Sequence, residues 1–209
     1  MDDKLIAAIA DLDEPNVLAM VMNRLEGGQD PASIFRACQE GMVQVGKRYE
    51  NCQYYISDLM LAGAIFKQAA TLLIPKLKPS ESIPRGKVVI GTVEGDIHDI
   101  GKDIVVMMLK AANYDVHDLG VDVPPRRFVD VLKETGAPVV GLSALLTTAF
   151  DSMKQTVSAL NAAGFRSRVR VMIGGGPVTE ETVNYTGADA RGRDAQAAVT
   201  LCNQWVKEG

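Results

Sequence analysis

The chain has 209 residues, of which 47% are hydrophobic, which is enough for one large domain or two small ones with buried cores. Its net charge of −4 argues against nucleic acid as the main partner, because binding to phosphates requires a basic face. We expect a cytoplasmic protein without a membrane partner, since the N-terminus lacks a signal-peptide pattern and no stretch approaches the ~20 uninterrupted apolar residues of a membrane span.

The first 75 residues carry apolar side chains at helical spacing and almost no strand pattern. Helices are predicted at about residues 5–9, 17–25, 31–49 and 59–74. Asp30 followed by Pro31 is a good start signal for the third of them, and Pro75 is a natural stop for the fourth. Four helices with short connections predict a four-helix bundle over residues 1–75.

Residues 76–86 are mostly polar and contain Pro79 and Pro84, so we interpret them as a linker and expect a hinge there. From Lys87 onward, strand and helix patterns alternate. Strands are predicted at 87–93, 115–119, 138–143 and 169–174, with a weak fifth near 188–189, and helices at 101–112, 125–135, about 150–163 and 194–207. This alternation predicts a doubly wound parallel sheet over residues 87–209.

Several unusual loops follow the predicted strands, which places them at one edge of the sheet, where α/β proteins bind ligands. They span residues 95–101, 120–125, 143–148 and 174–177. In the first loop, Asp96 stands two residues before His98, which favours an imidazole oriented by a carboxylate, as in metal-binding histidines. The glycines 174–176 would let a ligand approach the backbone closely. The loops together indicate a bulky ligand that carries a metal.

Taken alone, a histidine at a strand end is more often a surface or hydrogen-bonded loop residue than a metal ligand. His117 lies inside a predicted strand, and we interpret it as structural or exposed. Further Cys or His residues at zinc-ligand spacing are missing, and the three cysteines lack CxxC spacing and are expected to be reduced thiols. A protein that holds a metal through one histidine must take the other ligands from a cofactor, and a corrinoid supplies four equatorial nitrogens with a free axial position.

The motif Asp96-x-His98-x-x-Gly101, followed by Ser143-x-Leu145 and then Gly174-Gly175, resembles the cobalamin-binding signature of methionine synthase and of corrinoid methyl-carrier proteins. The resemblance covers nearly the whole chain, because the helical N-terminal half looks like the cap domain of that family. It implies a helical cap followed by a Rossmann-like, flavodoxin-like domain that binds cobalamin or a related corrinoid.

The resemblance implies that the corrinoid binds base-off/His-on, with His98 as the lower axial ligand of cobalt and Asp96 bonded to the other imidazole nitrogen. The same loop would contact the cofactor through Ile97, Asp99, Ile100 and Gly101. The slot for the nucleotide tail would be lined by Ser143, Leu145, Thr147, Gly174, Gly175 and Gly176. Three residues of the cap, Tyr49, Ile56 and Leu59, would cover the upper face of the corrin, although their pattern also suits a plain bundle core.

The chain departs from methionine synthase at one position. In that enzyme a Ser six residues after the first Ser of the Ser-x-Leu motif completes a relay with the Asp and the His, and here the position holds Ala149. The hydroxyl link to Asp96 is therefore absent at that position, with Thr148 as a nearby substitute. The departure puts the tuning of protonation in doubt, and it leaves the proposed ligand in place.

The resemblance implies a carrier, itself non-catalytic, of a methyl group on cobalt, within a multi-protein system of one-carbon metabolism. The carrier would move between a substrate:corrinoid methyltransferase and a second methyltransferase whose acceptor is tetrahydrofolate or a thiol, and a separate activator would reduce Co(II). The methyl donor stays open between methylamine, methanol, glycine betaine and an aryl methyl ether, the last as in an O-demethylase. Two alternatives are the cobalamin subunit of an adenosylcobalamin mutase, which usually lacks the cap, and a cobalamin-dependent regulator, which usually carries a DNA-binding module.

Overall fold

A computed structural model describes residues 3–76 and 84–208 of the chain, so residues 77–83 of the predicted linker lie outside the described residues. The chain divides into two compact units. One comprises Met1–Pro84 together with Ala111–Asn113, and the other comprises Arg85–Lys110 and Tyr114–Gly209. Each unit is described by itself.

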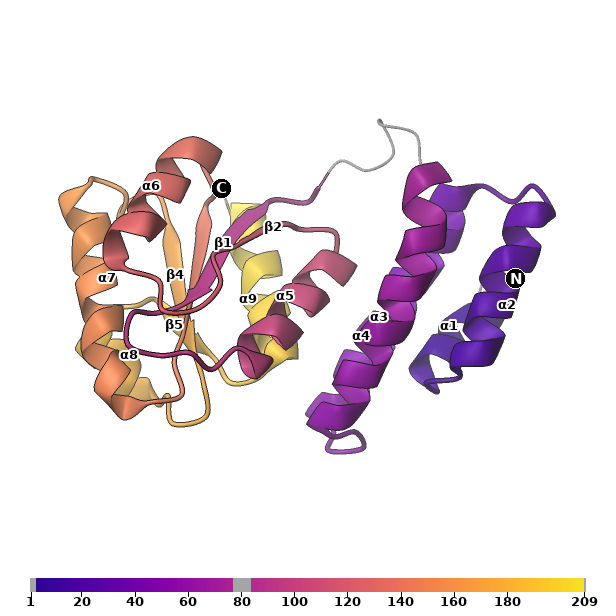
Figure 1. The fold of residues 1–209 in the computed structure, drawn as a ribbon, viewed down its shortest axis with the longest axis horizontal. Helices are drawn as coiled ribbons and strands as arrows, with labels where there is room; N and C mark the ends of the chain where they lie inside the picture. The colour runs from indigo at the N-terminus through magenta and orange to yellow at the C-terminus, as the bar shows by residue number, and fades with distance from the viewer. Residues whose placement is uncertain (1–2, 77–83, 209) are drawn as a thin grey trace. The chain divides into compact units, whose positions relative to one another are not determined.

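The first unit is the predicted helical bundle (Figure 1). Its helices are α1 (Asp3–Ala10), α2 (Glu14–Glu26), α3 (Pro31–Glu50) and α4 (Ile56–Leu73), and α4 is followed by a short 3-10 turn, Ile74–Lys76. The carboxylate of Asp30 caps α3, because it accepts hydrogen bonds from the backbone N–H groups of Ala32 and Ser33. A Cβ on Gly41 of α3 would lie 2.7 Å from Cβ of Ile9, so this glycine lets α1 pack closely on α3.

The stretch Ile56–Lys76 is long and apolar enough to cross a membrane by length and composition, and it is the one such helix in the part of the chain that the structure describes. Its buried residues form a stripe that includes Ala62, Phe66 and Leu73, and α4 packs through it on α2 and α3. A core helix of a bundle has this arrangement.

The second unit is a five-stranded parallel sheet in the order β2-β1-β3-β4-β5. The strands are β1 (Lys87–Thr92), β2 (Asp115–Asp118), β3 (Val139–Ser143), β4 (Arg170–Gly174) and β5 (Ala190–Gly192). The helices are α5 (Ile100–Ala111), α6 (Pro125–Thr135), α7 (Phe150–Ala162), α8 (Glu180–Thr186) and α9 (Ala195–Glu208). Figure 1 shows α5 and α9 on one face of the sheet and α6, α7 and α8 on the other. The predicted doubly wound sheet is therefore confirmed.

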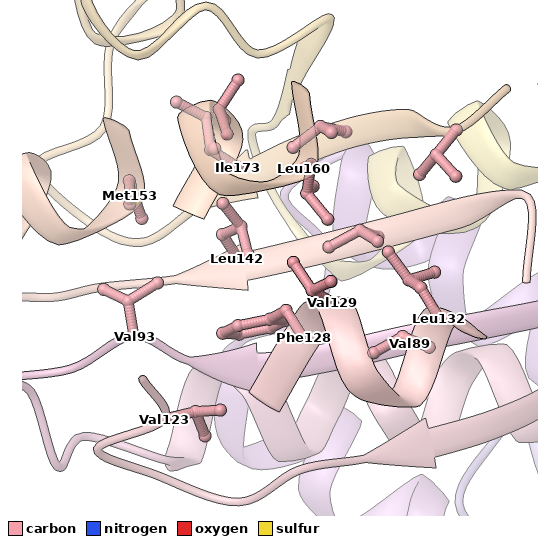
Figure 2. Packing of buried hydrophobic residues seen from close by; sticks show 14 of the residues in the cluster. Val89, Val93, Val123, Phe128, Val129, Leu132, Leu142, Met153, Leu160 and Ile173 are labelled. Carbon is pink, nitrogen blue, oxygen red and sulfur yellow. The ribbon is translucent and has the colours of Figure 1, made fainter. Parts of the chain in front are cut away.

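The central strands are buried at nearly every position, as expected for parallel strands that helices cover on both faces. Figure 2 shows Phe128, Val129 and Leu132 of α6 gathered with Val89 of β1 and Leu142 of β3 in one apolar cluster. Gly91 makes room for this cluster, because a Cβ there would lie 3.0 Å from the ring of Phe128. The packing fixes β1, whose carboxyl end continues into the loop that carries His98.

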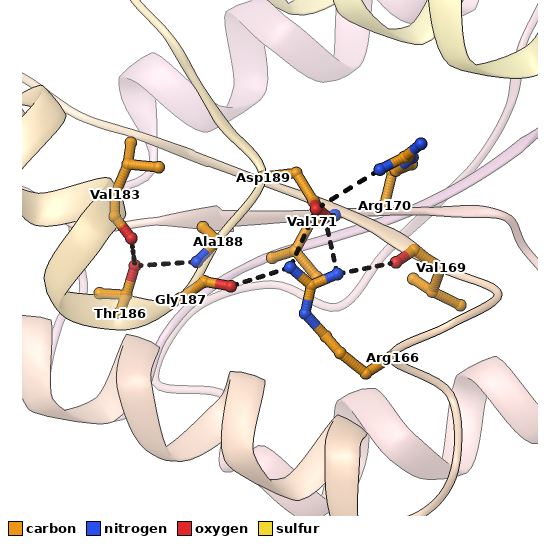
Figure 3. Close-up of polar contacts among 9 residues, drawn as sticks. All are labelled: Arg166, Val169, Arg170, Val171, Val183, Thr186, Gly187, Ala188 and Asp189. Atoms are coloured by element: carbon orange, nitrogen blue, oxygen red, sulfur yellow. Dashed lines mark hydrogen bonds and ion pairs between the residues drawn. The ribbon is translucent and has the colours of Figure 1, made fainter.

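An ion pair stabilises the sheet at the edge where β4 begins, opposite the edge from which the His98 loop extends (Figure 3). Arg166 donates from both terminal nitrogens to the carboxylate of Asp189, at 3.0 and 2.9 Å, and that carboxylate also accepts from the backbone N–H of Val171 at 2.7 Å. The side chain of Asp189 thus takes the place of a strand acceptor. The fifth strand begins at Ala190, slightly later than the pattern predicted.

Helix α8 was not predicted, because it has only seven residues and several of them are polar or β-branched. The local sequence marks this helix only by the residues that cap its two ends. Thr179 and Thr182 bond each other's backbone N–H groups at the start, and Gly187 ends the helix in the left-handed conformation with φ 75°.

Candidate functional site

The sheet order reverses direction between β1 and β3, since β1 connects to β2 on one side and β3 connects to β4 on the other. Ligands of doubly wound sheets bind outside the carboxyl ends of the strands at such a switch point. The loop that contains Asp96 and His98 follows β1, and the loop that begins after Ser143 follows β3. The fold therefore brings both predicted motifs to the position where a ligand is expected.

The carboxylate of Asp96 joins these two loops. The residue is 1% exposed. Its Oδ1 accepts from the backbone N–H of His98 at 3.0 Å and lies 2.7 Å from Nδ1 of the imidazole. Its Oδ2 accepts from the backbone N–H groups of Leu145 at 2.6 Å and Leu146 at 2.9 Å. Two segments almost fifty residues apart in the chain are thus held on one carboxylate.

These hydrogen bonds determine the charge of Asp96. Burial opposes ionisation, but hydrogen bonds from the backbone of Leu146 and His98, the imidazole of His98 and the backbone of Leu145 outweigh it. They lower the pKa of Asp96 to about 2. The carboxylate is therefore ionised at neutral pH and acts as an acceptor only.

His98 is held from two sides. Its carbonyl oxygen accepts from the hydroxyl of Thr92 at 2.9 Å, and Thr92 is fully buried at the end of β1. Because the ionised Asp96 can only accept, Nδ1 of His98 carries a proton, and in the neutral imidazole Nε2 then presents the lone pair. The imidazole side chain is 48% exposed. Nε2 is thus the nitrogen that this geometry leaves for a metal.

The surroundings of His98 fit a macrocycle that brings its own metal. Within residues 3–76 and 84–208, there is no group of three or more His, Cys, Asp or Glu that could hold a metal ion. A metal at His98 must therefore arrive with further ligands of its own. Large apolar side chains are exposed on the loops at this sheet edge, namely Ile97, Ile100, Val121, Leu145 and Leu146. Exposed apolar side chains in this number favour a broad, largely apolar ligand.

The glycines of the site differ in whether a side chain would fit at their position. Gly175 has φ 137°, and a Cβ there would lie 1.8 Å from the carbonyl oxygen of Ala144, so only glycine fits. Gly101 meets nothing within 4 Å of an added Cβ, and Gly176 meets only the side chain of Leu145 at 3.4 Å. Gly175 is therefore required by the fold, whereas the space beside Gly101 and Gly176 is open to a ligand.

The remaining predicted residues of the loops lie at the same edge. Asp99 is exposed, and its carbonyl oxygen accepts from the backbone N–H of Asp103, so that α5 begins at Ile100, one residue before the prediction. Ser143 ends β3 and is half-buried, and Thr147 is exposed in a short 3-10 turn. The elements thus place these residues around the loop that carries His98.

Ala149 stands where methionine synthase has the serine of the relay, and it is buried, with 2% of its surface exposed. Its neighbour Thr148 is exposed. The second oxygen of Asp96 is occupied instead by two backbone N–H groups, those of Leu145 and Leu146. Backbone donors of the loop after β3 thus hold the carboxylate.

The three predicted cap residues have different surroundings within the bundle. Leu59 is 2% exposed and belongs to the buried stripe of α4, because its side chain lies on the face that packs inside the bundle. Tyr49 is half-buried on α3, and Ile56 is 53% exposed at the start of α4. Met60 is 50% exposed one turn after Ile56. Leu59 thus fits the core interpretation, and Ile56, Met60 and Leu61 are large apolar side chains that α4 exposes near its start.

Family models match both parts of the chain. Two models described as the B12 binding domain match residues 86–200 and residues 1–74. The chain belongs to the B12-binding protein family. The predicted corrinoid cofactor is thereby confirmed, and the helical cap and the sheet domain each correspond to a recognised part of the family.

Individual relatives resemble the chain over most of its length. The dimethylamine corrinoid protein of Methanosarcina barkeri is 37% identical over 203 residues, which cover 96% of this chain and 95% of the relative. A cobalamin-binding protein from Desulfitobacterium hafniense, known from its crystal structure, is 41% identical, with a TM-score of 0.82 and 98% of both chains covered. A chain of the methanol:cobalamin methyltransferase complex from Methanosarcina barkeri has a TM-score of 0.84 and 25% identity over 98% of this chain and 79% of its own.

Proposed function

We propose that this chain carries a methyl group on the cobalt of a bound corrinoid between two methyltransferases, with the cofactor base-off and His98 as the lower axial ligand. The observation that carries the proposal is the imidazole of His98, whose Nδ1 lies 2.7 Å from the buried Asp96 and whose Nε2 is left for a metal. When bound, the corrinoid supplies a cobalt centre that accepts a methyl group and gives it up again.

The residues of the chain bind and orient the cofactor. Asp96 keeps the proton of His98 on Nδ1 and orients the ring, while the hydroxyl of Thr92 holds the backbone of the same residue. The exposed apolar side chains of Ile97 and Ile100 would exclude water from the bound corrinoid. The nucleotide tail would be held by a further set of residues, Gly101, Ser143, Leu145, Thr147, Gly174, Gly175 and Gly176.

The relatives favour the partners of a methyl carrier. A dimethylamine corrinoid protein is 37% identical to the chain, which favours a methylated amine as the methyl donor. The likeness to a chain of a methanol:cobalamin methyltransferase complex favours a methyltransferase as the partner that loads the corrinoid. The proposal includes a second methyltransferase, which passes the methyl group to tetrahydrofolate or a thiol, a reductive activator of Co(II), and a cytoplasmic location.

A methyl-loading assay tests this function. The full chain is reconstituted with hydroxocobalamin, reduced with titanium(III) and mixed with either a dimethylamine-specific or a methanol-specific corrinoid methyltransferase and its substrate. We expect the absorbance of the bound corrinoid to change to that of the methylated form with the amine pair, and to stay unchanged when the methyltransferase is left out. Loading with methanol alone would contradict the assigned donor, and loading with neither enzyme would contradict the carrier function.

A further inference from the structure

The segment that follows β2 runs beside the loop that carries His98. The backbone N–H of Thr92 donates to the carbonyl oxygen of Gly120 at 2.9 Å, and the N–H of Glu94 donates to that of Val123 at 2.9 Å. Val93 and Val123 also form a parallel bridge beyond the ends of the named strands. This segment is therefore fixed to the sheet and forms a rigid neighbour for the loop.

Asp122 holds the beginning of that loop. Its Oδ1 accepts from the backbone N–H of Gly95 at 2.8 Å, and its own N–H donates to the carbonyl oxygen of Asp96 at 2.9 Å. Its φ of 53° lies in the left-handed region, which Asp and Asn tolerate better than other residues with a side chain. The backbone on both sides of the Gly95–Asp96 peptide is thereby tied to Asp122.

Asp118 holds the end of the loop, where α5 begins. Both of its carboxylate oxygens accept from Nζ of Lys102, at 2.9 and 2.8 Å, and Oδ1 also accepts from the backbone N–H of Gly120. The side chain of Lys102 is 2% exposed, and it also donates to Asp103 at 2.5 Å. Because a buried ammonium group needs a partner, this contact fixes the first turn of α5 against the end of β2.

We infer that Asp118 and Asp122 are positioning residues, which clamp the two ends of the loop and so set how readily Nε2 of His98 binds the metal of the corrinoid. This inference rests on the proposed function, because it assumes that His98 is the axial ligand. A loop fixed at both ends presents Nε2 in one place, whereas a loop free at one end loses conformational entropy each time the nitrogen binds. We therefore expect the effect of the clamp on cofactor binding to depend on the presence of His98.

Variants at position 122 separate the hydrogen bond from the backbone strain. Asp122→Gly removes the acceptor and accepts a positive φ, and Asp122→Asn keeps both an acceptor oxygen and a tolerance for that φ. The full chain is loaded with hydroxocobalamin and reduced to Co(II), and electron paramagnetic resonance gives the ratio of His-on to His-off cofactor. Asp122→Gly loses one hydrogen bond, so we expect its ratio of His-on to His-off cofactor to fall about three- to tenfold. A rise of the same factor in the dissociation constant is the equivalent result. Asp122→Asn should retain wild-type values.

A double-mutant cycle with His98→Ala shows whether Asp122 acts through the histidine. We expect Asp122→Gly to leave the affinity for hydroxocobalamin unchanged when His98 is already absent. An equal loss of affinity in both backgrounds would overturn the inference, as would unchanged ratio and affinity in the wild-type background. If His98→Ala itself changes neither the spectrum nor the affinity, the proposed ligand is wrong, and the inference fails together with it.

The other end of the loop gives an independent check. Asp118→Asn keeps an acceptor for Lys102 but removes the negative charge, so the His-on ratio or the affinity should fall in the same direction as for Asp122→Gly. Asp115→Asn is the matched control. Asp115 also lies on β2, but its Oδ2 lies 3.3 Å from Nε2 of His117, so it pairs with that residue rather than with the loop. Equal effects at positions 115 and 118 would overturn the role of Asp118.

Discussion

The backbone of Gly175 lies so close to Ala144 that a Cβ on the glycine would be 1.8 Å from the carbonyl oxygen of Ala144. A hydrogen bond from the N–H of Ala144 to the carbonyl oxygen of Gly174, at 3.0 Å, fixes the same approach. The loops after β3 and β4 thus pack backbone against backbone beside the loop that carries His98. This contact is made entirely by backbone atoms of the chain itself.

Gly175→Ala should therefore destabilise the apo protein by about 3 kcal/mol or more, because the clash adds to a φ of 137° that Ala does not adopt. Urea unfolding of the apo protein measures the change, with Gly176→Ala as the matched control. The control has room for a methyl group and should unfold within about 1 kcal/mol of wild type. An unchanged unfolding midpoint for Gly175→Ala would show that the two loops do not pack this way.

Gly101→Ala should change the stability of the fold and the affinity for the cofactor in opposite directions. An added Cβ meets nothing within 4 Å, and the residue lies in the first turn of α5, so the change should stabilise the apo protein by up to about 1 kcal/mol. The affinity for hydroxocobalamin should nevertheless fall, since the methyl group would occupy the space of the nucleotide tail. Equal affinities of the variant and the wild type would remove Gly101 from the binding site.

Asp96 should make the apo protein sensitive to acid. Its pKa of about 2 lies below the ordinary value of 3.8, so its carboxylate stabilises the fold above about pH 4, and this contribution is lost as the pH falls toward 2. The difference corresponds to about 2 kcal/mol at pH 7. Asp96→Asn should lower the free energy of unfolding by about this amount at pH 7 and by less at pH 3.

Asp99→Asn provides the control for that measurement, because Asp99 is exposed in the same loop. Its free energy of unfolding should follow that of the wild type at both pH values. A difference between Asp96→Asn and wild type that stays constant from pH 7 to pH 3 would contradict the assigned cause, since it would not depend on the ionisation of the carboxylate.

The cysteines should differ in reactivity. Burial raises the pKa of Cys38 and of Cys202 to about 12, with a small opposing effect of Arg24 on Cys38, whereas Cys52 is exposed. At pH 8 roughly one in ten thousand of the buried thiols is ionised, so a disulfide reagent should react quickly with one thiol per native chain. Cys52→Ser should abolish the fast reaction. A fast reaction of two or three thiols would show that the cores around Cys38 or Cys202 open readily.

Local sequence patterns were sufficient to predict the bundle, the alternation of strands and helices, and the pairing of Asp96 with His98, because each depends on residues close together in the chain. The contacts that complete the site are not local. The hydrogen bond from Leu145 to Asp96 and that from Gly95 to Asp122 depend on which strand ends the sheet order brings together. No spacing rule shows them before the topology is known.

Two further features of the structure could not be predicted from local patterns. The side chain of Leu59 continues the helical stripe of apolar residues in α4, and that stripe faces the inside of the bundle. A stripe of this kind shows that a residue lies on one face, but not whether that face packs on a neighbour or on a ligand. Thr92 carries no sequence signal for its contact with His98, because a threonine at the end of a buried strand is ordinary β-sheet composition.

The most direct test of the account is the coordination of cobalt by His98. The full chain is loaded with hydroxocobalamin and reduced to Co(II), and its electron paramagnetic resonance spectrum is compared with that of His98→Ala. We expect nitrogen superhyperfine splitting from the imidazole in the wild type and its loss in the variant, with the variant still folded. The same nitrogen splitting in both proteins would show that another group binds the metal, and would contradict the account.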